Sequence, residues 1–108
     1  MNVTYSEKAK QSEDYPLLER ATAVLEQAVS EANKVLGRFA DEVSAAWDRE
    51  EDAKKGPVYV LRLSDWSGSV SNPYSADELR SGVNLNPLWR HLLKIRSHKL
   101  LEKHLNGE

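Results

Sequence analysis

Cysteine is absent from this chain of 108 residues, and no long apolar run occurs in it. Without cysteine, a disulfide framework, a thiolate metal site and a catalytic thiol are all excluded, and a reducing, cytoplasmic compartment is the expected location. A membrane span needs roughly 20 consecutive apolar residues, and because no run approaches that length we expect no membrane partner. The first residues are polar and lack the apolar core of a secretory signal, which predicts a protein that is not exported.

A broad excess of positive charge is absent as well, since the net charge is −2. Residues 1–55 hold eight Lys/Arg against twelve Asp/Glu, whereas residues 56–108 hold seven against five. A basic field over the whole domain, of the kind that binds duplex DNA non-specifically, is therefore excluded, and any nucleic-acid surface has to be local. The length predicts one domain over residues 1–108, in which residues 1–12 form a flexible tail or a frayed helix start.

Catalytic motifs are missing too. The chain has no glycine-rich phosphate loop, no GxSxG elbow and no HExxH pair, and the spacing of its serines and histidines singles out no set. His91 and His98 are two helical turns apart, roughly 10 Å along the axis, which is beyond the reach of one zinc ion. We therefore expect no enzyme activity, no cofactor and no metal site.

What the sequence does have is a regular apolar pattern in its first half. From residue 17 the apolar residues recur at steps of three and four through three heptads, and the pattern shifts where Glu42 falls on the apolar line. The KKGP run at residues 54–57 is typical of a helix end. The pattern predicts one helix over about 15–55, or two shorter helices if the chain bends at Gly37.

The predicted helix is too long for a compact domain. At 1.5 Å per residue it spans roughly 60 Å, whereas a compact domain of this length has a diameter of roughly 34 Å. An overhanging apolar seam has to be covered by a second copy or by another protein, and we expect a homodimer. The alternative is a seam that packs on the chain's own C-terminal helices. The seam residues are Leu18, Ala21, Leu25, Ala28, Ala32, Val35 and Phe39.

After Gly56 the apolar residues alternate with a period of two, which predicts strands. We expect a two-stranded antiparallel hairpin over about 58–74 that pairs Leu61 with Tyr74, because this register gathers the apolar residues on one face. A register that pairs Ser64 with Val70 splits them between two faces. The returning strand should lie at an edge, since its proline has no N–H for the ladder.

Polar residues around the hairpin are typical of turns and caps rather than of a reactive loop. The SADE run at residues 75–78 is a capping box, and Asp65 to Gly68 fit a turn. Trp66 has no such role in a turn or cap. It either folds back onto the sheet or a helix, or stands exposed as an anchor for a partner protein. As an exposed residue it would bind the partner together with Val43 and Trp47, which lie on the widened face of the long helix.

The C-terminal segment is predicted to be helical and basic. Ser97 is an acceptable N-cap, so the helix over about 87–105 is expected to break there. Its cations offer a local surface for nucleic acid. They are Arg90, Lys94, Lys99 and Lys103.

Together these features predict an α+β, mostly α fold with a long N-terminal helix at about 15–55, a two-stranded hairpin at about 58–74 and short C-terminal helices at about 76–82 and 87–105. The predicted function is that of a non-enzymatic protein–protein interaction module, an adaptor, regulator or antitoxin-like protein that self-associates through its long helix. The alternative is a dimeric nucleic-acid-binding regulator that uses the basic C-terminal helix.

Overall fold

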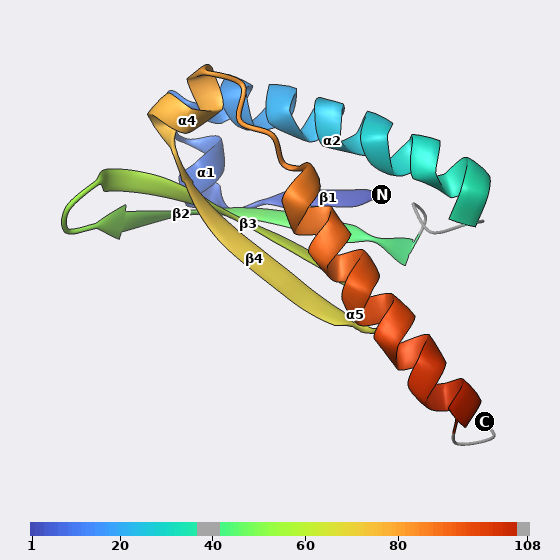
Figure 1. The fold of residues 1–108 in the computed structure, drawn as a ribbon. Coiled ribbons are helices and arrows are strands. Elements are labelled where there is room, and N and C mark those ends of the chain that lie inside the picture. The colour runs from blue at the N-terminus through green and yellow to red at the C-terminus, as the bar shows by residue number, and fades with distance from the viewer. Residues whose placement is uncertain (37–41, 106–108) are drawn as a thin grey trace.

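The structure is a computed structural model, and it describes residues 1–36 and 42–105. Its strands form one mixed sheet, against which the longer helices pack (Figure 1). In chain order the elements are β1 (Asn2–Tyr5), α1 (Glu7–Lys10), α2 (Tyr15–Leu36), β2 (Ser44–Asp52), β3 (Gly56–Asp65), β4 (Gly68–Ser75), α4 (Ala76–Arg80) and α5 (Asn86–Leu105).

The predicted helix over about 15–55 is wrong, because α2 is described only as far as Leu36 and the chain then forms strand β2. In β2 the side chains of Ala45 and Trp47 are buried while those of Ser44 and Ala46 are exposed, which is the two-residue period of a strand. The length mismatch that predicted a dimer disappears with the long helix. The predicted bend at Gly37 lies outside the described residues.

The predicted fold of a long helix and an isolated hairpin is also wrong, since β3 and β4 belong to a four-stranded sheet of order β1-β2-β3-β4. Strand β1 pairs parallel with β2, and the other two pairs are antiparallel. Parallel neighbours need a crossover connection, which α1 and α2 provide. Residues 1–12, expected to form a flexible tail or a frayed helix start, contain strand β1 and helix α1.

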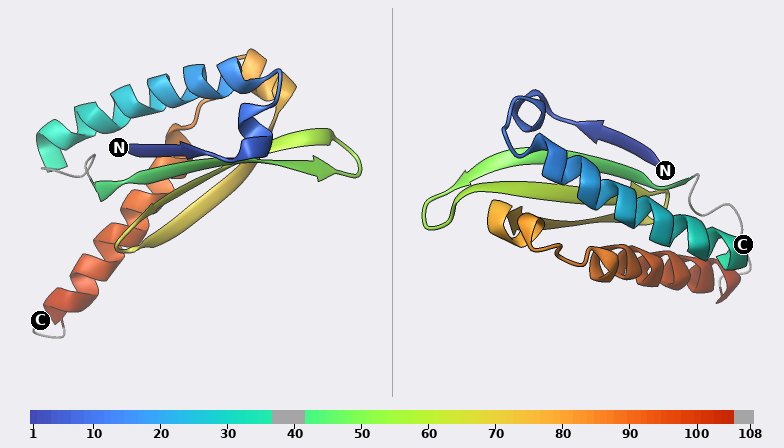
Figure 2. Two further views of the ribbon diagram at one scale, coloured as in Figure 1. Left: turned by 180° about the vertical axis from the view of Figure 1, so that it is seen from behind. Right: turned by 90° about the horizontal axis from the view of Figure 1, so that it is seen from above.

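Helices α2 and α5 cover the same face of the sheet; they are neighbours in the view from above (Figure 2) and diverge toward their C-terminal ends (Figure 1). The core forms between these helices and the inward-facing residues of the strands. Its largest fully buried side chains are Trp47, Tyr59, Leu18, Leu25, Leu61, Leu63, Leu92, Val29 and Val43. On the other face of the sheet, positions such as Thr4, Ala46 and Ser71 are exposed.

The hairpin of β3 and β4 has the predicted buried face but not the predicted register. Leu63 pairs with Val70, and Tyr59 with Tyr74, a shift of two residues from the register that joins Leu61 to Tyr74. All five of these side chains are buried. Because side chains alternate along a strand, a shift of two residues changes the partners and leaves the same side chains facing inward.

The turn between β3 and β4 is two residues long, with Asp65 paired to Gly68. The predicted pairing of Asp65 with Val70 is therefore wrong, and within the turn the Asp65 carboxylate accepts a hydrogen bond from the backbone N–H of Ser67 at 2.7 Å. A Cβ added at Gly68 would lie 3.3 Å from the Cγ2 atom of Ile95. The turn thus approaches helix α5 closely.

The ends of the C-terminal helices follow the sequence in part. The capping box is confirmed, since Ser75 accepts from the Glu78 backbone N–H and the Glu78 side chain accepts from that of Ser75, each at 3.1 Å. The expected break at Ser97 is wrong, because α5 runs unbroken through that residue. Pro73 lies on β4 at one edge of the sheet, as predicted.

Within the ranges 1–36 and 42–105, no helix combines the length and the apolar character needed to cross a lipid bilayer.

Candidate functional site

The second half of helix α5 runs clear of the sheet, and we call its residues 97–105 the α5 arm (Figure 1). Every residue of the arm is exposed, whereas Leu92, one turn before it, is fully buried. Three leucines of the arm face water: Leu100 is 49% exposed, Leu101 53% and Leu105 74%. The arm therefore presents apolar side chains that the chain's own core does not use.

The exposed surface of α5 has a shallow depression between its side chains. This depression is lined by Lys94, Ser97, His98 and Leu101, together with Leu93. Residues spaced i, i+3, i+4 and i+7 form the hole that a side chain of a facing helix enters in coiled-coil packing, and the first four have this spacing. The small side chain of Ser97 leaves the depression open between two leucines.

Trp66, in the turn between β3 and β4, lies where the arm leaves the sheet. Its ring is 47% exposed, and the cationic groups of Arg96 and Lys103 lie 5.5 Å and 5.1 Å from ring centroids of this indole. Arg96 also forms an ion pair with Glu42 and lies 3.8 Å, from Nη1 to Oδ2, from the buried carboxylate of Asp65. These attractions join the β3–β4 turn to helix α5.

The charge of the molecule is divided between α5 and the rest. Helix α5 carries five Lys/Arg against Glu102 alone, a net charge of +4, so the remainder of the chain carries −6 of the total of −2. The charge of Arg96 is neutralised by the carboxylates of Glu42 and Asp65. The other cations of α5 are exposed, and they are Arg90, Lys94, Lys99 and Lys103. The projecting helix is thus the basic part of an otherwise acidic molecule.

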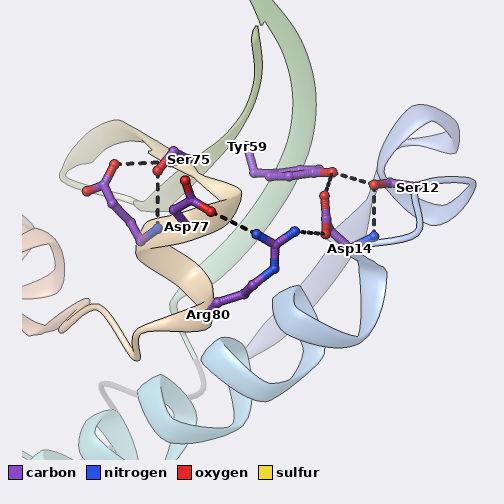
Figure 3. A network of polar contacts seen from close by, with 7 residues as sticks. Ser12, Asp14, Tyr59, Ser75, Asp77 and Arg80 are labelled. Carbon is purple, nitrogen blue, oxygen red and sulfur yellow. Dashed lines mark hydrogen bonds and ion pairs between the residues drawn. The ribbon is translucent and has the colours of Figure 1, made fainter. Parts of the chain in front are cut away.

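A separate polar cluster lies where α2 begins, close to β3 and α4 (Figure 3). The hydroxyl of Tyr59 donates to the Asp14 carboxylate at 2.7 Å and shares a hydrogen bond with the hydroxyl of Ser12. Arg80 donates to Asp14 at 3.5 Å and to Asp77 at 2.8 Å. Burial raises the pKa of Tyr59 above its ordinary value, so its phenol is neutral at physiological pH.

This cluster has the residue types of a catalytic site, but its groups are engaged in holding α2. The Ser12 hydroxyl accepts from the Asp14 backbone N–H at 3.1 Å, and the Asp14 carboxylate bonds Tyr59 and Arg80 rather than the serine. A serine nucleophile needs an adjacent base, and all three histidines lie on α5. Among the described residues, no group of three or more His, Asp or Glu is arranged to hold a metal ion. We interpret the cluster as a structural feature that holds the start of α2 against β3 and α4.

The predicted self-association seam faces the chain's own sheet. Leu18 and Leu25 are buried in the core, and Ala21, Ala28 and Ala32 are half-buried. Phe39 and the side chain of Val35 lie outside the described residues. The described part of the seam therefore packs within one chain and presents no apolar stripe to a second copy.

Of the residues predicted to bind a partner, Val43 and Trp47 are buried and only Trp66 reaches the surface. Leu101 and Leu105, which are exposed on the arm, were not among the residues predicted to bind a partner. Their spacing of four residues was the available signal, since residues four apart on a helix lie on one face.

Comparison with known proteins assigns no function. No family model matches the chain, and neither does any curated protein or solved structure. The functional assignment therefore depends on the geometry and charge of α5.

Proposed function

We propose that the protein is a non-catalytic interaction module that binds an acidic helical segment of a partner protein along α5. The observation that carries this proposal is the exposure of Leu101 and Leu105 on a helix held clear of the sheet. Burying a leucine on association contributes about 1.5–3 kcal/mol, so this pair offers a substantial apolar contact. The depression at Ser97 supports a helix as the bound shape, because it has the spacing of a coiled-coil hole.

The charge of α5 favours an acidic partner over a second α5. Lys94 and His98 line the same depression as Leu101, and Lys99 and Lys103 lie on the same helix. Two α5 helices packed together would bring their lysines close, and like charges across an interface disfavour association. An acidic helix seated in this depression pairs with Lys94 and covers Leu101 at the same time.

Nucleic acid is the second candidate, because α5 presents four exposed cations. Their arrangement supports it less well. Lys94 and Lys99 are five residues apart and therefore about 140° apart around the helix axis, so they do not form one phosphate-contacting stripe. Phosphate contacts also give no role to exposed leucines.

The two candidates differ in what they require of the arm. We would titrate the fluorescently labelled protein with an acidic amphipathic peptide of repeating Glu and Leu, with the same peptide in which Lys replaces Glu, and with duplex DNA, each at two salt concentrations. The proposal predicts that the acidic peptide binds and that neither the lysine peptide nor the duplex DNA does. The variant Leu101→Ser should weaken that binding at least about tenfold, since one buried leucine is lost.

The matched control is Leu85→Ile, a volume-conserving change of a buried leucine outside the arm, which should leave peptide binding unchanged. DNA binding that falls steeply with salt and is unaffected by Leu101→Ser would favour the nucleic-acid candidate instead. Light scattering on the free protein tests self-association, and a stable dimer that Leu101→Ser dissociates would show that the arm binds a second copy.

A further inference from the structure

A second candidate site lies away from the α5 arm, between α2 and the segment that joins α4 to α5. It is an apolar cleft of about 280 Å³. One wall consists of Ala21, Val24 and Leu25 of α2, and the opposite wall of Leu79, Val83 and Leu85. Three of these six side chains, those of Leu25, Leu79 and Leu85, are buried in the core, so the floor of the cleft is part of the folded structure.

Val24 is the residue that distinguishes this cleft from ordinary packing. It is 66% exposed although it lies on the wall of a concave apolar surface. A valine in that position gains little from the chain's own fold, and a ligand in the cleft would cover it. Small-molecule sites are concave and mostly apolar, with a few polar groups that fix the ligand's orientation.

The polar side chains at the cleft include three that can donate hydrogen bonds to a ligand. Arg20 lines it, and within residues 1–36 and 42–105 its guanidinium makes no hydrogen bond or ion pair. Asn84 and Asn86 line it too, and their side-chain oxygens already accept from the Asn86 backbone N–H at 3.0 Å and from the Trp89 indole at 3.3 Å. The amide nitrogens of both asparagines are thus left to donate, together with the cation.

We propose that this cleft binds a medium-chain carboxylic acid, with its apolar chain between Val24 and Val83 and its carboxylate at Arg20. Cation and amide donors fit an anion, and the apolar walls fit an alkyl chain. The volume sets the size, because a protein cavity of about half this volume holds one benzene molecule. A chain of medium length fits, whereas a long-chain fatty acid would protrude.

The test is a titration of the full protein with sodium octanoate, followed by backbone amide NMR shifts. We expect saturable shifts at residues 20–25 and 82–86. Octanol, which has the same chain without the charge, should bind about tenfold more weakly. The variant Arg20→Gln should weaken octanoate about tenfold and leave octanol unchanged, and Lys34→Gln, near the other end of α2, is the matched control that should change neither.

A third variant, Ala21→Leu, fills the cleft and should abolish binding of both ligands while circular dichroism remains that of the parent. Octanol that binds as tightly as octanoate, or an Arg20→Gln protein that binds octanoate normally, would overturn the proposal. So would tighter binding of N-acetyl-Leu-Leu than of octanoate, since the cleft would then recognise a peptide C-terminus. Leu101→Ser should leave octanoate binding unchanged, which separates this site from the α5 arm.

Discussion

The indole Nε1 of Trp47 donates a hydrogen bond to the hydroxyl of Thr22 at 2.8 Å. The two residues come from β2 and α2, both side chains are buried, and the threonine hydroxyl in turn donates to the carbonyl of Leu18 at 2.7 Å. A tryptophan can be buried completely only where its N–H finds an acceptor. This contact therefore joins β2, the strand that was not predicted, to α2, the helix that covers it.

The variant Thr22→Val should lower the free energy of unfolding by about 1–3 kcal/mol, because it keeps the side-chain shape and leaves the Trp47 N–H buried without an acceptor. Thr22→Ser is the control, since it keeps the hydroxyl and loses one methyl group. Urea unfolding followed by tryptophan fluorescence measures both. Equal stability of the valine variant and the parent would contradict the role of this hydrogen bond.

Alkaline pH should destabilise the protein through Tyr59. Burial raises its pKa in the folded state above the value of about 10 for an unfolded tyrosine, so its contribution to stability is complete below pH 10 and is lost as the pH rises through the folded pKa. Tyr5 and Tyr74 are shifted in the same direction, also mainly by burial. Tyr59→Phe should therefore show a shallower loss of stability between about pH 9 and 11 than the parent.

Thermal unfolding of Tyr59→Phe and the parent across that pH range measures the difference. The variant also loses the hydrogen bond to Asp14, so it should be less stable near pH 7, and the two stability curves should converge as the pH rises. Parallel curves would show that Tyr59 does not titrate differently in the folded and unfolded states.

Truncation of two leucines on the same helix should change stability by very different amounts. Leu92 is fully buried, so Leu92→Ala should cost about 2–5 kcal/mol of stability. Leu105 is mostly exposed, and Leu105→Ala should change stability by no more than about 0.5 kcal/mol. Denaturant unfolding compares them. A large loss in Leu105→Ala would show that the arm packs on the sheet and is not presented to a partner.

The close approach of the β3–β4 turn to α5 predicts the effect of Gly68→Ala. The new methyl group would lie 3.3 Å from Cγ2 of Ile95, which is tight enough that the isoleucine must move. Overpacking of this kind costs about 1–3 kcal/mol. Since leucine has no methyl branch at Cβ, adding Ile95→Leu should recover part of the loss, and a double variant no more stable than Gly68→Ala would assign the loss to the backbone.

The strand β2 was missed because two periods coincide in its sequence. Ala45 and Trp47, buried two residues apart, satisfy a strand, but Val43, Ala46 and Trp47 also continue the three-and-four spacing of the preceding helix. Alanine, glutamate and arginine around them favour helix by propensity. The shift of the apolar pattern at Glu42, interpreted as an irregularity within one helix, comes two residues before β2 begins at Ser44.

Local features were predicted well, and features that depend on distant contacts were not. The capping box at Ser75 and the inward face of Tyr59 follow from spacing within a few residues. The pairing of β1 with β2 depends on residues about 40 positions apart, and four residues such as Asn2–Tyr5 contain too little alternation to reveal it. The basic character of α5 could be predicted because it depends on neighbouring residues alone. Its projection beyond the sheet could not, because that depends on distant contacts.

The parallel pairing of β1 has a consequence for the order of assembly. Strands β2, β3 and β4 follow one another through short turns, so they can pair through contacts between residues close in sequence. Strand β1 can pair only after β2 and the intervening helix α2 have formed, and the entropy cost of closing this long loop slows the pairing further. We expect its amides to gain protection last during refolding in pulsed hydrogen exchange, and to be released first when the native protein opens.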